Sequence, residues 1–316
     1  MKRKTRILLL MTLIVTLAVF GAGCGAQESK PQEQPDSETT QDLPLTVGIM
    51  LAVDSAPLLL AEEMGFFDEL GLAVELQLFN NPQDRQSALQ TGRIDGAITD
   101  LIAVATNVDS GFDIKATTMT NGVFPVLSKE GAAEKKDIKV GMMEVSVTNF
   151  LIDEWLSGEY NIEKVFINDI PARLAAIGSG QLDMGLFPEP LASMGELNGL
   201  TKNIYQPESG FCPDVIVFTG KALTEKEEAI RLFHQAYDQA VEAINQDPAL
   251  ARDILMAKIP NLNPEIKDNI LLPEYTKASL PDDAYIEKII RWTAETMKKD
   301  LTVTPADLAE RKFTQS

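Results

Sequence analysis

The sequence predicts an α/β protein with two similar lobes, each a mostly parallel sheet flanked by helices. One stretch occurs twice, because NPQDRQSALQTGRIDGAITD at 81–100 matches DIPARLAAIGSGQLDMGLFPEP at 169–190 in its Arg, Ala, Gly and Asp positions. A second pair relates VGIM at 47–50 to VGMM at 140–143. Strand-like and helix-like segments also alternate, which is typical of parallel sheets. This internal duplication is too long in period for a solenoid, so it favours two facing lobes with a cleft between them.

The first copy contains the elements of one such lobe. Apolar or alternating segments predict strands over 45–50, 73–79, 94–99 and 114–119. Helices are predicted over 56–64, 83–91 and 101–108. Pro57 suits the first turn of a helix, and Gly65 and Gly92 suit the left-handed position that ends one.

The second copy follows the same order. An extended segment at 122–128 is predicted to cross between the lobes, followed by a solvated loop at 129–137. Strands at 138–143 and 164–167, a helix from Thr148 and a strand ending at Phe187 follow, and 214–219 crosses back. The crossings predict a hinge near 123–137 and 212–219.

The last part of the chain changes character. Thr224 and Glu227 have the spacing of a capping box. An apolar stripe then predicts a helix over 230–244, and further helices are predicted over 249–258 and 282–299. We expect these helices to pack on the first lobe.

The N-terminus predicts export and anchoring. A basic start precedes an apolar run of 14 residues, Ile7–Phe20, which is too short to span a membrane as a helix. Small residues then lead to Cys24, which resembles a bacterial lipoprotein signal: residues 1–23 are removed and Cys24 is lipidated. Residues 24–43 are polar and rich in Pro, which predicts a flexible tether. Ordinary secretion or an uncleaved anchor is the alternative.

Composition excludes several classes of protein. Loss of residues 1–23 leaves 24 basic against 47 acidic side chains, a net charge of −23 that opposes nucleic-acid binding. Only Cys212 remains after lipidation, so an intrachain disulfide is impossible. One His and no Cys cluster argue against a zinc site, and we expect no metal and no cofactor.

Three stretches together carry a resemblance to a known family. LLLAEEMGFFDELGLAVEL (58–76), SALQTGRIDGAITD (87–100) and QLDMGLFPEPLA (181–192) resemble the nitrate/sulfonate/taurine and thiamine-pyrimidine group of solute-binding proteins of ABC importers. The terminal WTAETMKKDLTVTPADLAERKF (292–313) is also similar, and the resemblance covers most of 44–316.

This resemblance implies a two-lobed, type II periplasmic-binding-protein fold. We expect lobe 1 to comprise 44–126 and 215–316, and lobe 2 to comprise 127–214. The resemblance also implies capture of a small molecule in the cleft and its delivery to a membrane permease that a cytoplasmic ATPase drives. The two-lobe plan leaves no amphipathic segment over, so we expect a monomer, and the lipoprotein signal places it at the extracytoplasmic face of the cell membrane, held by a lipid anchor.

Ligand-binding side chains are expected at the carboxyl ends of the strands, where helix N-termini also supply N–H donors. The positions are Asp54, Ser55, Asn81, Thr99, Asp100, Asn121, Ser146, Thr148, Phe187 and Glu189. Helix capping is the alternative for Asp54, Ser55 and Thr148.

Four other repeated residues receive structural interpretations. Asp95 and Asp183 precede strands and are predicted to tie their turns. Arg85 and Arg173 are interpreted as residues of helix surfaces or of contacts between elements.

The expected mouth of the cleft is acidic. It includes Asp54, Asp100, Glu144 and Glu189, and none of its expected positions is basic. Carboxylates near a desolvated anion are costly, so we favour an aminated heterocycle such as a thiamine-precursor pyrimidine, with Phe187 available to stack. A sulfonate, nitrate or similar small anion is the alternative. Two prolines flank Glu189, which predicts a fixed carboxylate; capping of the next helix is its alternative role.

Two other functions remain as alternatives. An enzyme on this fold would need a catalytic group, yet His234 stands alone and Cys212 has no His or Cys close to it in the sequence. We therefore expect no catalytic residue and no enzyme. A receptor or sensor subunit is the other alternative, which a neighbouring kinase gene, in place of permease and ATPase genes, would favour.

Overall fold

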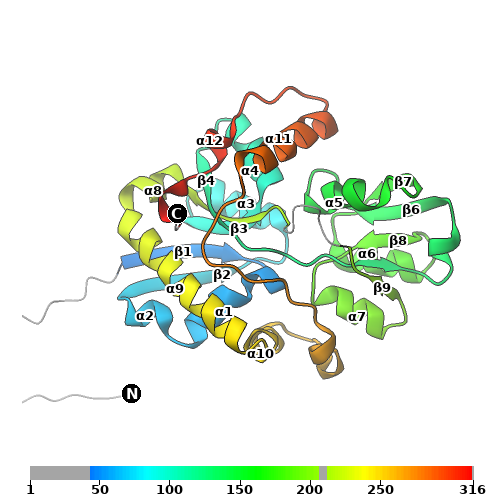
Figure 1. Ribbon diagram of the computed structural model, residues 1–316, viewed down its shortest axis with the longest axis horizontal. Helices are drawn as coiled ribbons and strands as arrows, with labels where there is room; N and C mark the ends of the chain where they lie inside the picture. Colours follow the sequence, from blue (N-terminus) through cyan, green and yellow to red (C-terminus); the bar gives the residue numbers. More distant parts are fainter. Residues whose placement is uncertain (1–42, 206–211, 315–316) are drawn as a thin grey trace, which may run out of the picture. The chain divides into compact units, whose positions relative to one another are not determined.

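The computed structural model describes residues 43–205 and 212–314, which belong to one compact unit (Figure 1). The predicted signal peptide, Cys24 and the tether up to residue 42 lie outside the described residues. Within the described part of the chain, every helix is too short or too polar to cross a membrane.

Two five-stranded sheets form the framework. The first has the order β2-β1-β3-β10-β4, with β1 (Leu43–Ile49), β2 (Leu72–Leu78), β3 (Gly96–Asp100), β4 (Ile114–Met119) and β10 (Asp214–Thr219). The second has the order β7-β6-β8-β5-β9, with β5 (Val126–Ser128), β6 (Asp137–Met142), β7 (Asn161–Phe166), β8 (Met184–Leu186) and β9 (Thr201–Asn203).

The two sheets have equivalent topologies. In the first, β10 runs antiparallel to both of its neighbours, β3 and β4, while β2, β1 and β3 pair in parallel. In the second, β5 takes the same place, antiparallel to β8 and β9. Each antiparallel strand is therefore the one that follows a passage from the other sheet. The predicted fold class, with mostly parallel sheets in two similar halves, is confirmed.

Helices cover both sheets. Those before β10 are α1 (Ala56–Glu63), α2 (Phe66–Glu69), α3 (Pro82–Gln90), α4 (Leu101–Asp109), α5 (Val147–Leu156), α6 (Ile170–Gly178) and α7 (Leu191–Leu197). Those after it are α8 (Gly220–Glu225), α9 (Glu227–Gln246), α10 (Ala249–Lys258), α11 (Asp283–Met297) and α12 (Pro305–Leu308). The 3-10 turns are η1 (Val53–Ser55), η2 (Ala132–Glu134), η3 (Pro264–Asn269) and η4 (Arg311–Phe313).

The repeated stretch folds in the same way twice. Asn81 caps α3 and Asp169 caps α6, each accepting a backbone N–H in the first turn. Gly92 and Gly180 end the two helices with φ of +70° and +76°, the region that glycine tolerates best.

The repeated aspartates tie the turns that follow these helices. The Asp95 carboxylate accepts the N–H of Thr46 at 2.8 Å, and the Asp183 carboxylate accepts that of Lys139 at 2.9 Å. This confirms the predicted structural role of both.

The long helix α9 buries its apolar stripe beside the first sheet and α1 (Figure 1). Phe233 packs edge-on against Phe218 of β10, with ring centroids 5.5 Å apart. His234 is buried beside them: its Nδ1–H donates to the Ile230 carbonyl, and its Nε2 faces the Thr117 hydroxyl. Burial lowers the pKa of His234 to about 4, so it is neutral at pH 7.

The predicted capping box is wrong. Thr224 lies inside α8, where its hydroxyl donates to the Gly220 carbonyl, and α9 begins after Lys226 without a side-chain cap. The hydroxyl thus bonds back along its own helix, which removes it from the following N-terminus.

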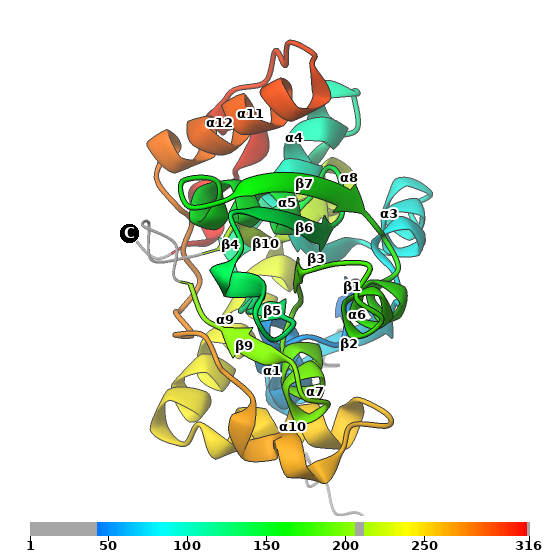
Figure 2. The same ribbon diagram turned by 90° about the vertical axis from the view of Figure 1, so that its right-hand side faces the viewer.

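Helix α11 contacts both halves of the molecule. It packs against α4, next to which it lies at the top of Figure 2. It also reaches α5, because the Trp292 indole N–H donates to the Asp153 carboxylate at 2.9 Å and its ring meets Phe150 edge-on. The C-terminal helices therefore pack beside the first sheet, as expected, and α11 also contacts α5.

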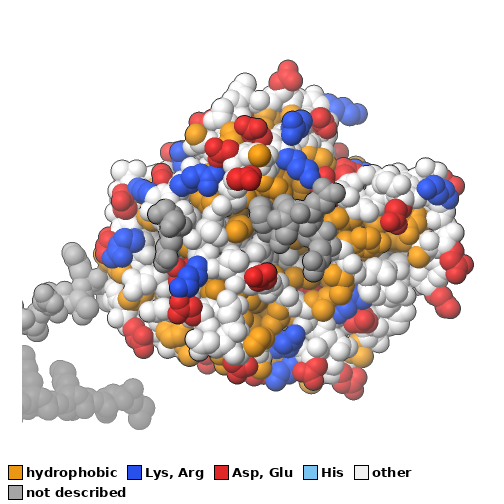
Figure 3. Space-filling view, in the orientation of Figure 1, with side chains coloured by type: hydrophobic (Ala, Val, Ile, Leu, Met, Phe, Trp, Pro, Cys, Tyr) orange, Lys and Arg blue, Asp and Glu red, His pale blue; other side chains and the backbone are white. Residues whose placement is uncertain are grey.

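Acidic and basic side chains are interspersed over the face drawn in Figure 3. Such mixing favours solubility.

Candidate ligand-binding site

A cavity of about 590 Å³ lies at the carboxyl ends of strands from both sheets. Met50 follows β1, Asp100 ends β3, Met143 follows β6 and Pro188 follows β8, and all four line it. Its volume suits a small molecule, and its position is the one that parallel α/β sheets use for ligands.

Five of the ten predicted positions line this cavity: Asp54, Thr99, Asp100, Ser146 and Thr148. Asp54 lies in the η1 turn. Asp100 caps α4, accepting the N–H of Ala103 at 2.8 Å. The Thr148 hydroxyl accepts the N–H of Met143 at 3.1 Å and bonds to Ser146.

Three other predicted residues, Ser55, Asn81 and Asn121, lie outside the lining, and each makes a hydrogen bond to the protein instead. Ser55 is buried and donates to the Met50 carbonyl at 2.6 Å. Asn81 caps α3, as described above. Asn121 adopts a left-handed φ of +51° and donates to the Glu274 carbonyl. These contacts correct the expectation that the three side chains point into the cleft.

Phe187 and Glu189 are also absent from the lining. Phe187 is fully buried beneath the Arg173 guanidinium, whose carbon lies 5.1 Å from the ring centroid, so the ring is covered by a protein cation. Glu189 is fully buried as well, and accepts both the hydroxyl of Ser193 at 2.8 Å and its N–H at 3.1 Å. Its carboxylate therefore accepts a backbone N–H in the first turn of α7, which is the helix-capping role given as the alternative for Glu189.

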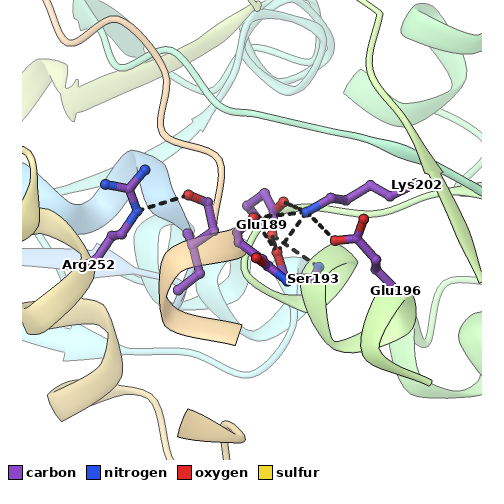
Figure 4. Close-up of polar contacts among 7 residues, drawn as sticks. Glu189, Ser193, Glu196, Lys202 and Arg252 are labelled. Carbon is purple, nitrogen blue, oxygen red and sulfur yellow. Dashed lines mark hydrogen bonds and ion pairs between the residues drawn. The ribbon is translucent and has the colours of Figure 1, made fainter. Parts of the chain in front are cut away.

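Glu189 is the centre of a buried polar cluster, shown in Figure 4. The Lys202 ammonium lies 3.2 Å from its carboxylate and also donates to Ser193 and to the Asn269 carbonyl of η3. The Glu189 carbonyl accepts the N–H of Val53, next to Asp54. We call Glu189, Ser193, Lys202 and the Asn269 carbonyl the Glu189 cluster. The cluster connects α7 and β9, which belong to the second half of the molecule, to η3.

The cavity contains two arginines that the sequence suggested were residues of helix surfaces or of contacts between elements. Arg85 of α3 and Arg173 of α6 occupy the same place in the two repeats, and both are buried and line the cavity. Each side chain passes over a strand glycine: a Cβ on Gly48 would lie 3.3 Å from the Cγ of Arg85, and one on Gly141 only 2.9 Å from that of Arg173. The recurrence of this Gly–Arg pair in both copies was the signal that could have revealed them.

Three carboxyl groups surround Arg85. Burial raises the pKa of Asp54 to about 6, and burial together with its acidic neighbours raises that of Asp214 well above its usual value. Burial also raises the pKa of Asp100, against the N–H groups of α4 and the charge of Arg85. Asp214 was missed because it begins β10, a strand we treated only as a crossing.

Gly122 leaves the space that Asp214 occupies. A Cβ there would stand 2.1 Å from the Oδ2 atom, which has no hydrogen-bond partner within the described residues.

Arg173 has a different environment. Its Nη1 donates to the Ile167 carbonyl at 2.8 Å, whereas its Nε has no partner among the described residues. Burial lowers its pKa to about 10, so it stays cationic at pH 7. Within residues 43–205 and 212–314 it forms no ion pair with a carboxylate.

Within the described ranges, no three His, Cys, Asp or Glu side chains are grouped so as to hold a metal ion. Burial raises the pKa of the Cys212 thiol, which disfavours the reactive thiolate.

Comparison with known proteins gives a family and a fold. A model of the family described as NMT1/THI5 like matches residues 52–251. The ligand-binding component of an ABC-type import system from Staphylococcus aureus is 19% identical with a TM-score of 0.74, over 86% of this chain and 98% of that one.

Two further solved structures have the same fold. The periplasmic aliphatic sulphonate binding protein SsuA from Escherichia coli is 16% identical with a TM-score of 0.67, over 85% of this chain and 92% of that one. The periplasmic nitrate-binding protein NrtA from Synechocystis is 13% identical with a TM-score of 0.64, over 86% and 92%.

A short segment is similar to the nitrate import ATP-binding protein NrtC of Synechococcus elongatus, 36% identical over 59 residues. The match covers 19% of this chain and only 9% of that relative.

Proposed function

This chain belongs to the NMT1/THI5-like family, and from that premise we propose that it is the solute-binding component of an ABC importer. It captures a small molecule in the cavity at the strand ends and delivers it to a membrane permease with a cytoplasmic ATPase. The cavity, lined from both sheets, carries this proposal. The three structures of the same fold, described as ligand-, sulphonate- and nitrate-binding proteins, support it.

We propose that the two sheets belong to two lobes, with residues 44–126 and 215–316 in lobe 1 and 127–214 in lobe 2. The passages near 123–137 and 212–219 then form a hinge that closes on a ligand touching both lobes. Asp54, Thr99, Asp100, Ser146 and Thr148 remain our proposed ligand contacts, joined by Arg85, Arg173 and Asp214.

Two ligand chemistries have support. The three carboxyl groups beside the first sheet, those of Asp54, Asp100 and Asp214, favour a ligand with N–H donors, such as a thiamine-precursor pyrimidine. The two arginines favour the alternative, a sulfonate or nitrate like the ligands of SsuA and NrtA.

Blocking the cavity should remove a bound solute. Ala103 lies on the cavity wall at the first turn of α4, so Ala103→Trp should fill the space and abolish ligand retention. Native mass spectrometry of the purified full-length chain checks this. Ala175→Trp, on an exposed position of α6, is the matched control and should retain the solute. A solute held equally by both variants would contradict binding in this cavity.

We propose that Cys24 carries a lipid anchor at the extracytoplasmic face and that the protein is a monomer. Cys24→Ala should then move the protein from the membrane fraction to the soluble fraction, because the tether that follows contains no apolar segment to hold it. Immunoblots of fractionated cells that lack the permease measure this. A variant that still sediments with membranes there would refute the anchor.

A further inference from the structure

We propose that the ligand is amphoteric: Arg173 binds its acidic group, and Asp54 and Asp214 bind its amine or amidine N–H group. We call the side of the cavity next to the second sheet, with Arg173, the lobe 2 wall. We call the side next to the first sheet the lobe 1 wall; it includes Asp54 and also Asp214, the first residue of β10 at the boundary between the proposed lobes. This inference rests on the proposed solute-binding function. It combines the two ligand chemistries that each half of the cavity favours separately.

The lobe 2 wall provides the positive end. Arg173 is fully shielded from solvent, and its Nε donor faces no protein acceptor in the described part of the chain. A buried cation with an unused donor is costly, so an acidic ligand group at this place would relieve it. The rest of this wall, which includes Val145, Ser146 and Thr148, contributes no charge.

The guanidinium is already fixed in place before a ligand arrives. The strand glycine Gly141 lets its stem pass, Phe187 supports its face, and the Ile167 carbonyl holds one nitrogen. A fixed guanidinium loses little conformational entropy on binding, and its planar donors match a carboxylate, sulfonate or phosphate.

The lobe 1 wall provides the negative end. Arg85 is its one cationic side chain among the described lining residues and faces three carboxyl groups. Asp100 already receives N–H groups of α4. For Asp54 and Asp214, burial outweighs what the protein supplies. Asp54 has the charge of Arg85, local backbone N–H groups and the Ser55 hydroxyl 3.5 Å away, and the Oδ2 of Asp214 has no partner among the described residues. A ligand N–H donor bearing positive charge satisfies both.

The separation of charge between the walls favours one molecule over two. A simple anion would bind Arg173 but leave Asp54 and Asp214 uncompensated, and a simple amine would leave Arg173 uncompensated. A molecule with both groups neutralises both walls, and in a two-lobed binding protein it links them.

Two size-matched triads of probes test this by calorimetric titration of the full-length protein, freed of bound solute. One triad is γ-aminobutyrate, butyrate and butylamine; the other is an aminopyrimidine carboxylate, the pyrimidine carboxylate and the aminopyrimidine. In at least one triad the amphoteric member should bind about tenfold or more tighter than either partner, which is the loss expected for one charge-assisted hydrogen bond. A partner that binds as tightly as the amphoteric member, or no binding by either amphoteric member, would overturn the inference.

Variants assign the two ends. Arg173→Gln should weaken the amphoteric probe about 10- to 150-fold and leave the amine probe within about twofold. Asp214→Asn, which is nearly isosteric, should weaken the amphoteric probe and spare the acid probe, and it decides the matter if Arg173→Gln does not fold. Arg231→Gln, at a position of α9 whose side chain is 55% exposed, is the control and should change nothing. If a variant loses the same factor of affinity for all three probes, the assignment of Arg173 to the acidic group and of Asp214 to the amine group is refuted.

The two proposals can fail separately. If butyrate or butylamine binds best and Ala103→Trp abolishes that binding, the solute-binding function stands and the amphoteric ligand does not. If the amphoteric probe binds with the expected variant pattern but never stimulates a cognate permease and its ATPase, the ligand class stands and the importer role fails.

Discussion

Replacing Lys202 by Met should lower the free energy of unfolding by about 3–5 kcal/mol, the range for removal of one partner of a buried ion pair. The Glu189 carboxylate has no exposed surface, and the side chain of Lys202 is only 5% exposed. Burial raises the pKa of Glu189 while Lys202 and Ser193 lower it, so Lys202→Met leaves a buried carboxyl without its cation. Urea unfolding at pH 7 measures the loss.

Glu196 supplies a matched control for this substitution. It also pairs with Lys202, at 2.8 Å, but its side chain is 37% exposed. Glu196→Gln should therefore cost no more than about 1 kcal/mol, as surface ion pairs do. The double variant Lys202→Met/Glu189→Gln should recover part of the loss, because the uncompensated charge is gone. Equal losses for Lys202→Met and Glu196→Gln would show that the Glu189 cluster does not act as a buried ion pair.

Replacing Arg85 by Met should lower the free energy of unfolding by about 1–3 kcal/mol at pH 7, the scale for loss of a buried hydrogen-bond partner, and the loss should shrink in acid. Arg85 donates to the Thr99 hydroxyl at 3.1 Å. Met keeps the stem that passes over Gly48 but removes the charge that faces Asp54, Asp100 and Asp214. Without it, the pKa values of these carboxyl groups rise further.

The pH dependence of this stability loss follows from the linkage between proton binding and folding. A carboxyl whose pKa in the folded state is raised, as that of Asp54 is to about 6, favours the folded state below its unfolded value near 3.8. That contribution is lost as the pH rises through about 6. Removal of Arg85 enlarges this loss. The free energy of unfolding of Arg85→Met should therefore lie furthest below that of the unmodified protein at pH 7, and the two values should converge near pH 4.

Unfolding curves of both proteins between pH 4 and 7 measure this difference. His234 titrates in this window too, but equally in both proteins, so it cancels. Arg231→Met is the control for loss of an exposed guanidinium. If the difference in free energy of unfolding between the two proteins stays constant with pH, Arg85 acts through packing and not through the carboxyl groups.

The sequence by itself determined the elements and their repetition, because these depend on neighbouring residues. Gly92 and Gly180 end their helices through a left-handed φ, and periodicity marks strands such as β2. The ties from Asp95 and Asp183 could be predicted as well, since the same carboxylate precedes the same strand in both copies.

Only the tertiary structure decided where side chains at the strand ends point. Arg85 and Arg173 look like helix-surface residues locally, and they enter the cavity because a glycine on a strand 37 or 32 residues earlier leaves room for each stem. Glu189 has the right position for a ligand contact, yet its carboxylate pairs with Lys202, which the Asn269 carbonyl of η3 also holds. A buried charge binds the partner that folding brings nearest, and partners so distant in sequence leave no local pattern.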